Sequence, residues 1–186
     1  MARASSFEGF RFGLNQGDSS GSQMIVAAKS PNAAAFQTLV HSYDAMVMRV
    51  ALALTGSESS AQEIYFRVFR DAFASVTELH SDSSVFIWLH RILVTHCIDY
   101  CRRNQDDFAR SGSHNLAEVL RALPPTERVV FLLKHFQGLK IRTVAEIFRC
   151  SPERITRVLR SATIDLRARL NLSFHQIAWT SNLESE

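Results

Sequence analysis

The feature that most constrains the fold is the stretch 123–170, where apolar residues recur at helical spacing between two sharp breaks. Prolines 124 and 125 come just before the first apolar run, and proline in a first helical turn loses no hydrogen bond that the helix needs. Gly138 then ends the run, because glycine readily takes the left-handed conformation found at helix ends. A second short run covers about 141–148, and 149–151 form a tight turn before a third run. The stretch therefore predicts two short helices, a turn and a longer helix.

The third helix is predicted to begin at Ser151-Pro152-Glu153, which supplies a hydroxyl cap, a preset φ and a carboxylate near the positive end of the helix dipole. Its apolar residues share one face: Ile155, Val158, Leu159, Ala162 and Leu166. Arg154, Arg157 and Arg160 recur every third residue on the other side. This is the layout of a helix-turn-helix, whose second helix lies in the major groove of DNA, where arginine bonds guanine edges or phosphates with two hydrogen bonds. The competing interpretation is a solvated basic face on an ordinary three-helix domain.

Charge is unevenly distributed along the chain. Residues 115–170 hold eleven Lys/Arg against five Asp/Glu, a surplus of +6, whereas 36–114 hold seven against nine, a balance of −2. The basic surplus therefore lies in the half with the helix-turn-helix pattern, as expected for a module that binds phosphates. No apolar run approaches the ~20 residues that cross a bilayer, and the N-terminus lacks the apolar core of a signal peptide. We expect a cytoplasmic protein without membrane insertion.

Three further helices are predicted upstream. The first runs from about 30 to Gly56, and the third runs from Val85 to about Arg103. The second is expected to be capped by Ser59-Ser60, which stand three residues before Gln62-Glu63 at the spacing of a capping box. No alternating strand pattern is found anywhere in the sequence, so the fold is predicted to be all-α.

This pattern divides the chain into two small helical domains joined by a short linker. The expected boundaries are a disordered N-terminal arm at 1–30, a first domain at 31–103, a linker at 104–114, a second domain at 115–170 and a C-terminal tail at 171–186.

The residues indicate neither catalysis nor metal binding. His96, Cys97 and Cys101 lie on one predicted helix, and three ligands on one helix do not make a tetrahedral metal site. Buried cysteines are the better interpretation, and with Cys150 the total is three, which does not suggest a disulfide framework. No nucleophile–base pair or glycine-rich phosphate loop is present in the sequence. We expect no enzyme activity, no metal and no cofactor.

Motifs in both halves resemble the extracytoplasmic-function (ECF) sigma factors of the sigma-70 family. In the C-terminal half, the motifs that look like region 4 of that family are Leu123-Pro124, Glu127-Arg128, 130–133, Gly138-Leu139, Val144-Ala145-Glu146-Ile147 and Ser151. In the N-terminal half, those that look like region 2 are Leu54-Thr55-Gly56, 61–69, 86–92, Ile98-Asp99 and Arg102-Arg103. The resemblance covers about 33–170 and implies a region 2-like bundle followed by a region 4-like helix-turn-helix.

The resemblance also implies three groups of contact residues. Contacts to the −35 promoter element are expected from Arg142, Glu153, Arg154, Thr156, Arg157 and Arg160. Contacts to the −10 element and its melted strand are expected from Trp88, Arg91, Thr95, His96, Asp99, Tyr100, Arg102 and Arg103. Contacts to the polymerase clamp are expected from Gln62, Glu63, Phe66, Arg67, Phe69 and Arg70. The implied partners are core RNA polymerase, through its clamp and flap regions, and promoter DNA, with an anti-sigma factor as a further candidate.

The chemistry of promoter opening agrees with the second group. Exposed bases are stabilised by aromatic stacking and by positive charge along the single strand. By resemblance, His96 and Tyr100 would face the non-template strand, with the loop 75–84 capturing a flipped base. For Trp88, which precedes Leu89, a place in the core is the stronger interpretation.

Departures from the family pattern leave alternatives open. Phe66 and Arg67 stand where the clamp-binding helix usually has carboxylates, Thr95 replaces a frequent asparagine, and Arg149 replaces the turn glycine. The eleven-residue linker reaches about 36 Å at ~3.3 Å per residue, no more than the ~34–36 Å of one DNA turn, and the two promoter elements of the family lie further apart. We favour a working sigma factor. The alternatives are a sigma-like adaptor or decoy that binds an anti-sigma factor or other regulator without initiating transcription, and a plain DNA-binding regulator that uses only 115–170.

Overall fold

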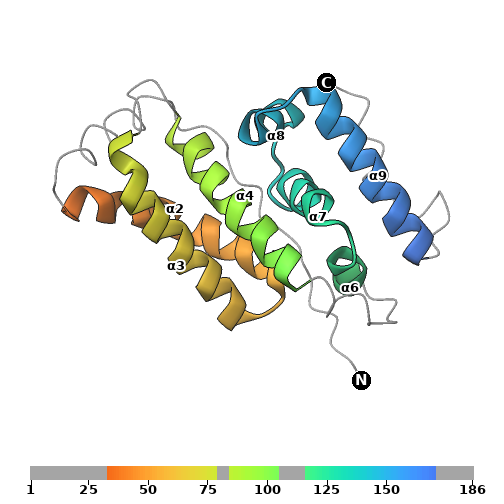
Figure 1. Cartoon of the computed structure of the whole chain (residues 1–186), viewed down its shortest axis with the longest axis horizontal. Helices are drawn as coiled ribbons and strands as arrows, with labels where there is room; N and C mark the ends of the chain where they lie inside the picture. The colour runs from red at the N-terminus through yellow and green to blue at the C-terminus, as the bar shows by residue number, and fades with distance from the viewer. Residues whose placement is uncertain (1–32, 79–83, 105–115, 171–186) are drawn as a thin grey trace.

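Helices account for all the regular structure in the part of the chain that the computed structural model describes, which is residues 33–78, 84–104 and 116–170 (Figure 1). In chain order they are α2 (Ala33–Thr55), α3 (Glu58–Ser75), η1 (Val76–Glu78), α4 (Val85–Arg103), α6 (Leu116–Arg121), α7 (Pro125–Phe131), η2 (Leu132–Phe136), α8 (Ile141–Phe148) and α9 (Pro152–Leu170). The predicted all-α fold is confirmed. The predicted arm, the tail, nearly all of the linker and most of the 75–84 loop lie outside the described residues.

The N-terminal group consists of α2, α3 and α4, with α3 packed against both of the others. Gly56, with φ of 66°, ends α2 in the left-handed conformation. Ser57 then caps α3, because its hydroxyl accepts a hydrogen bond from the Ser60 N–H at 3.5 Å. The predicted cap at Ser59-Ser60 is therefore wrong: the chain re-enters a helix directly after the left-handed glycine, two residues earlier than expected. The predicted bounds of α4 are confirmed, and Ser84 caps it.

The C-terminal group contains the predicted helix-turn-helix. The second short helix, α8, has the expected bounds, and the turn after it is formed by Arg149 in the left-handed conformation with φ of 52°. The helix α9 begins at Pro152, and the Ser151 hydroxyl accepts a hydrogen bond from the Arg154 N–H at 3.4 Å. The predicted hydroxyl cap and first-turn proline of α9 are both confirmed.

A π-helical turn, η2, continues α7 as far as Phe136. The N–H of Gln137 donates to the Leu132 carbonyl oxygen at 3.0 Å, five residues back, which is the spacing of a π turn. The N–H of Leu139 donates to the Leu133 carbonyl oxygen at 3.1 Å, and Gly138, with φ of 70°, closes the turn. This turn brings the chain round from α7 to α8.

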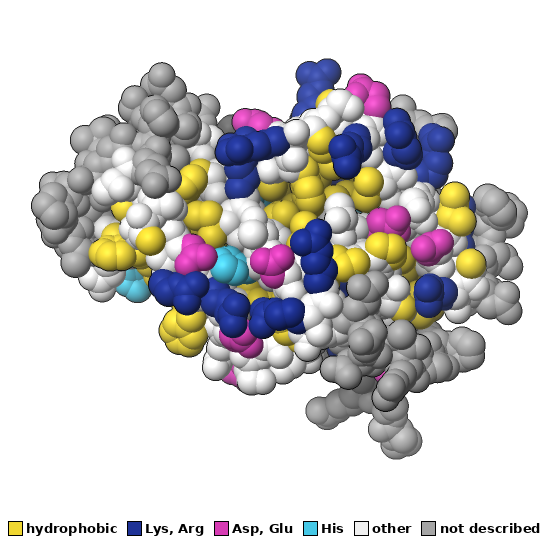
Figure 2. Space-filling view, in the orientation of Figure 1, with side chains coloured by type: hydrophobic (Ala, Val, Ile, Leu, Met, Phe, Trp, Pro, Cys, Tyr) yellow, Lys and Arg dark blue, Asp and Glu magenta, His cyan; other side chains and the backbone are white. Residues whose placement is uncertain are grey.

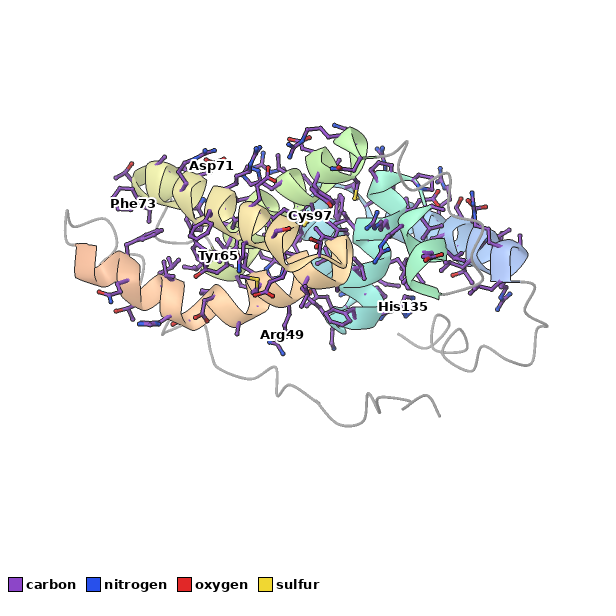
Figure 3. The ribbon with its side chains drawn as sticks, turned by 90° about the horizontal axis from the view of Figure 1, so that it is seen from below. Arg49, Tyr65, Asp71, Phe73, Cys97 and His135 are labelled. Atoms are coloured by element: carbon purple, nitrogen blue, oxygen red, sulfur yellow. The ribbon has the colours of Figure 1, made fainter. Side chains whose placement is uncertain are left out.

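The main hydrophobic core runs through both groups of helices. It joins buried residues from Leu39 on α2 to Leu159 on α9, with α4 between the two groups (Figure 1). Cys97 and Cys101 on α4 are buried in it, as expected, and Cys97 lies among the helices in Figure 3. Burial raises the pKa of both thiols, which keeps them protonated. A smaller cluster holds the outer end of α9 against α6 and α7.

Within the described residues, no helix combines the length and apolar character that a membrane span requires.

Candidate nucleic-acid interface

The helix α9 presents the predicted arginine row to solvent. Ile155, Leu159 and Ala162 are buried, and this orientation leaves Arg154, Arg157 and Arg160 exposed on the outer side. Figure 2 shows Lys and Arg side chains gathered over the part of the molecule where α8 and α9 lie. None of the ion pairs within the described residues involves this row. The row therefore provides three guanidinium groups that an incoming phosphate or base edge can reach.

The other predicted −35 residues differ in charge and in the hydrogen bonds that they already make. Arg142 is exposed on α8. Glu153 is exposed in the first turn of α9, where hydrogen bonds from Ser151 and from its own backbone N–H lower the pKa of its carboxyl. Thr156 donates its hydroxyl hydrogen to the Pro152 carbonyl oxygen at 3.0 Å, so its methyl group is its more available part. Charged side chains thus dominate this surface.

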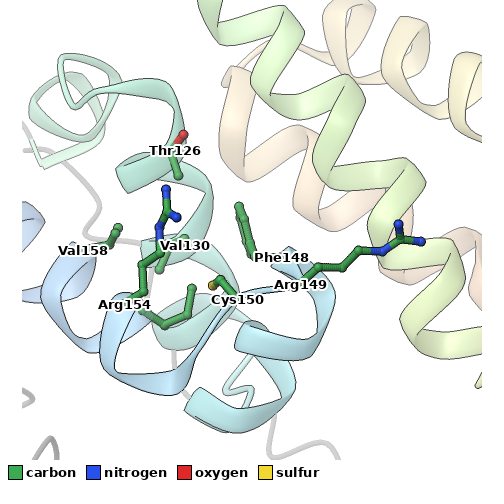
Figure 4. A pocket seen from close by; sticks show the side chains of 8 residues that line it. Thr126, Val130, Phe148, Arg149, Cys150, Arg154 and Val158 are labelled. Carbon is green, nitrogen blue, oxygen red and sulfur yellow. The ribbon is translucent and has the colours of Figure 1, made fainter.

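Sequence reasoning did not assign a role to Arg149, although it noted that arginine replaces a turn glycine there. The left-handed conformation is unfavourable for a residue with a long side chain. Arg149 is exposed and, with Arg154, borders a small pocket between the start of α7 and the α8–α9 turn (Figure 4). The remaining residues that line the pocket are Thr126, Val130, Phe148, Cys150, Ile155 and Val158. In Figure 4 the Arg149 side chain extends away from Arg154, so the turn adds an exposed cation that lies apart from the arginine row.

The predicted −10 residues on α4 fall into two sets. Thr95, Asp99, Arg102 and Arg103 are exposed. Arg102 lies 3.7 Å from the Asp99 carboxylate, and Arg103 reaches Glu63 of α3 at 3.6 Å. Three of these four residues are charged, and together with Thr95 they form a polar surface at the C-terminal half of α4, adjoining α3.

The other four predicted −10 residues on α4 are partly or fully buried. Trp88 is half-buried and packs against the main core, as the stronger interpretation expected. Arg91 is half-buried and donates from Nη2 to the Glu146 carbonyl oxygen on α8 at 2.9 Å.

The structure does not present His96 and Tyr100 to solvent as the resemblance implied. His96 Nε2 lies 2.8 Å from the Asp71 carboxylate of α3, because α3 covers that side of α4. Burial alone would raise the pKa of the Asp71 carboxyl, but hydrogen bonds from Arg70 and His96 lower it. Tyr100 is only 8% exposed and belongs to the core. Both side chains contribute to packing in this conformation.

The clamp-facing prediction for α3 also needs one correction. Phe69 is 7% exposed and packs edge-on against Tyr65 with ring centroids 4.8 Å apart, so it is a core residue. It is buried because it shares the inward side of α3 with Ala72. Phe66 is 67% exposed.

The charged residues of α3 are exposed or half-buried, and all but Glu58, which accepts from Gln62 at 3.3 Å, form ion pairs. Arg67 pairs with Glu63 at 2.7 Å, and Glu63 also receives Arg103. Arg70 pairs with Asp71 at 2.9 Å, and Gln62 accompanies them on the exposed surface. The result is a surface with a large exposed aromatic ring among charge pairs.

Comparison with known proteins agrees with these features. The family model described as Sigma-70, region 4 matches residues 113–159. RNA polymerase sigma factor SigV of Bacillus subtilis is 26% identical over 114 residues, which cover 53% of this chain and 69% of SigV. RNA polymerase sigma-H factor of Pseudomonas aeruginosa is 20% identical over 158 residues, which cover 69% of this chain and 82% of that factor.

Two solved structures share the fold. CnrH, solved in complex with the cytosolic domain of CnrY, has a TM-score of 0.66 and 22% identity, over 81% of this chain and 97% of CnrH. The sigma factor RpoE of Bartonella quintana, solved with the anti-sigma factor NepR, has a TM-score of 0.58 and 17% identity, over 74% of this chain and 98% of RpoE. Residues 113–159 thus resemble region 4 of the sigma-70 family, the two curated relatives are RNA polymerase sigma factors, and the chain shares the helical fold of the two solved structures.

Proposed function

We propose that this protein is a working ECF-type sigma factor, which binds core RNA polymerase and directs promoter-specific transcription initiation. The observation that carries the proposal is the row of exposed arginines on α9, directly after a helix-turn-helix turn that adds the further cation of Arg149. The protein performs no catalytic step itself under this proposal. It positions DNA for the catalytic site of the polymerase.

Recognition of the −35 element is assigned to the helix-turn-helix. With α9 in the major groove, Arg154, Arg157 and Arg160 reach guanine edges or phosphates, and Glu153 accepts from a cytosine amino group. Arg142 and Arg149 flank the helix and suit phosphates, which set the register of the protein on the duplex.

Recognition and opening of the −10 element are assigned to α4. Its exposed Thr95, Asp99, Arg102 and Arg103 provide hydrogen-bonding and cationic groups for a separated strand. Trp88 is a half-exposed aromatic group on this helix, as Phe86 is, and its ring can stack on an unpaired base. His96 and Tyr100 would join them only after α4 loses part of its present covering.

Binding to the polymerase clamp is assigned to α3. Glu63 is held between Arg67 and Arg103, whereas the exposed Glu58 carboxylate accepts from the neutral Gln62 amide at 3.3 Å and keeps its charge available. Phe66 adds an aromatic ring that gains free energy by being buried. The clamp surface that receives α3 should therefore provide an apolar socket at Phe66, with polar groups around its edge.

The first test is co-elution of the purified full chain with core RNA polymerase from its own host. A stable complex would support the proposal, and in vitro transcription from a library of host promoters would then identify the target. A folded, monodisperse protein that does not bind the polymerase would contradict it.

The −35 assignment is tested with a matched pair of arginines on α9. Arg157→Ala should weaken binding to the −35 duplex by about 1–3 kcal/mol if Arg157 contacts a base. Arg169→Ala removes the same charge from an exposed position on the same helix, beyond the row, and should have little effect. Equal losses from the two substitutions would show that only net charge matters and would contradict base recognition by the row.

A second candidate function is a sigma-like adaptor that binds an anti-sigma factor without initiating transcription. Two observations favour it: the altered charge of α3, and the solution of the structural neighbour RpoE with its anti-sigma factor. This function predicts a stable complex with a small regulatory protein and none with the polymerase. A plain DNA-binding regulator predicts duplex binding that survives substitution of Trp88, with no complex of either kind.

A further inference from the structure

The arginine row of α9 continues into an exposed apolar residue. Ile164 is 58% exposed. It follows Arg157 by seven residues and Arg160 by four, and these spacings place the three side chains on one side of the helix. Ala168, one turn further along, is exposed as well. We call Arg157, Arg160, Ile164 and Ala168 the outer face of α9, which is cationic towards its N-terminal end and apolar towards its C-terminal end.

The outer face points away from the helices on which α9 packs. The helix contacts α6, α7 and α8, and its buried side chains include Ile155, Leu159 and Leu166 on the opposite side. In Figure 1, α9 lies along the edge of the molecule. The two arginines of the outer face form none of the ion pairs found within the described residues. This face is therefore accessible to another part of the chain.

The sequence continues after α9 with residues 171–186, which lie outside the described residues, and their chemistry is complementary to the outer face. This segment contains Glu184 and Glu186 and no Lys or Arg. It also contains aromatic and aliphatic side chains, among them Phe174, Ile177 and Trp179. Guanidinium groups pair with carboxylates and stack on aromatic rings, and apolar side chains gain free energy when they are buried together. The segment and the outer face therefore match both in charge and in apolar character.

The segment is also long enough to reach the outer face. From Leu170 back to Arg157 is thirteen residues of α-helix, a rise of about 20 Å. The fourteen residues from 171 to 184 span up to about 46 Å when extended. The excess leaves room for a reversal of direction after Leu170, and Asn171 and Ser173 are residue types that favour turns.

We propose that residues 171–186 fold back and dock on the outer face of α9. Their apolar side chains pack on Ile164, and the carboxylates of Glu184 and Glu186 pair with the two arginines. The inference rests on the proposed function in one respect, because the covered surface is the one assigned to the −35 element. The docked segment therefore competes with DNA for the arginine row.

The expected strength of docking suits such competition. Exposed ion pairs contribute little individually, because water and salt screen them. The segment is attached to α9, however, so its effective concentration at the outer face is high. Duplex DNA has a much denser negative charge than two carboxylates and can displace them. Docking should thus lower the affinity for every DNA sequence by the same factor, so that only the tightest sites remain occupied.

Trp179 can report docking in the full chain without DNA. Trp88 and Trp179 are the two tryptophans of the sequence, so Trp88→Phe leaves Trp179 as the single fluorophore of its kind. Acrylamide quenching measures its accessibility, and a peptide of residues 171–186 gives the value for an undocked segment. We expect Trp179 to be quenched less in the protein than in the peptide. Ile164→Ser should raise quenching to the value of the peptide, whereas Leu52→Ser, at a 45% exposed leucine on α2, should change nothing.

Three results would overturn the docking. The first is quenching in the protein equal to that in the peptide. The second is protection that Ile164→Ser leaves in place, because the segment would then pack elsewhere. The third is protection that rises with protein concentration, because the segment would then lie on a second copy. Both control and test substitutions replace exposed side chains and should preserve the fold, which circular dichroism verifies.

Binding to duplex DNA measures the competition itself. For a segment docked in about 90% of molecules, deletion of 171–186 should raise the affinity about tenfold. The gain should be the same for a promoter and for an unrelated duplex. Ile164→Ser should raise the affinity of the full chain and leave that of the shortened chain unchanged. A gain that persists in the shortened chain would show that Ile164 acts on DNA directly and would overturn the competition.

The fluorescence measurement needs neither promoter nor polymerase, so its result is separate from that of the proposed function. A protected Trp179 in a protein that does not co-elute with the polymerase would keep the docked segment and remove the sigma-factor role. Co-elution with the polymerase together with an unprotected Trp179 would do the reverse.

Discussion

Acid should destabilise this protein through His135, a half-buried residue on η2 whose ring stacks on Phe131 at a centroid distance of 4.5 Å. Burial, with the nearby charge of Lys134, lowers the pKa of His135 from 6.5 to about 4. Between these values the unfolded chain binds a proton that the folded chain does not. The stabilising contribution of the neutral ring is therefore complete above pH 6.5 and is lost as pH falls toward 4. Burial lowers the pKa of His90 as well, which acts in the same direction.

The magnitude follows from the two pKa values. A shift from 6.5 to about 4 gives a loss of roughly 2 kcal/mol between pH 7.5 and pH 5 by linkage. Because the ring is only half-buried, solvent screening reduces this to about 1 kcal/mol. His135→Phe keeps an aromatic ring against Phe131 and removes the titrating group. Between pH 7.5 and pH 5, the free energy of unfolding of His135→Phe should therefore decrease by about 1 kcal/mol less than that of the wild type.

Urea unfolding at pH 7.5 and pH 5.0 measures this difference as a change in midpoint at constant slope. His41 is exposed on α2 and provides the control, since His41→Gln should leave the acid sensitivity of the wild type in place. If His135→Phe and the wild type lose equal stability on acidification, the reasoning about His135 is refuted.

Two other substitutions separate folding from binding. Leu159→Ala removes a fully buried side chain from α9 and should cost about 2–5 kcal/mol of unfolding free energy, measured by the same urea titration; a cost below about 1 kcal/mol would show that α9 does not pack as described. Phe66→Ala removes an exposed ring and should leave stability within about 0.5 kcal/mol, while greatly reducing co-elution with the polymerase. Retained co-elution would exclude Phe66 from the clamp contact. Phe73→Lys gives a matched control, because Phe73 is a second exposed aromatic residue on the same helix. Its ring packs edge-on against Phe36 of α2.

Local sequence signals predicted the helices well, because they act within a few residues. The spacing of apolar residues predicted the bounds of α4 and α8. The Ser151 hydroxyl and the proline after it predicted where α9 begins. The cap of α3 was misplaced, because Ser57, Ser59 and Ser60 are all chemically able to cap and only the backbone after Gly56 decides between them. The local pattern therefore predicted that a helix is present more reliably than it predicted the residue at which that helix begins.

The site was harder to predict, because exposure depends on which helices cover which face. Phe69, His96 and Tyr100 were assigned to surfaces from motif position alone, and each is covered by packing that involves another helix or the core. Arg128 was counted in the basic surplus of residues 115–170, yet it is buried and donates to the Leu54 carbonyl oxygen at the end of α2. Its partner is 74 residues away in the chain, and no local pattern encodes such a pairing.

The π turn at η2 changes how the chain would respond to the loss of one residue. A π turn contains one residue more than an α-helical turn, so removal of a single residue from Leu132–Phe136 would let the segment relax into a regular α-helix. Because the α-helical turn completes the same circle with one residue fewer, the chain after the deletion would keep nearly the same direction, and Gln137 would stay on the side of His90. The same deletion in the middle of α9 would rotate every later residue of that helix by about 100° and would break its apolar face. The segment between α7 and α8 is therefore where the helix-turn-helix unit is expected to tolerate a change of length best.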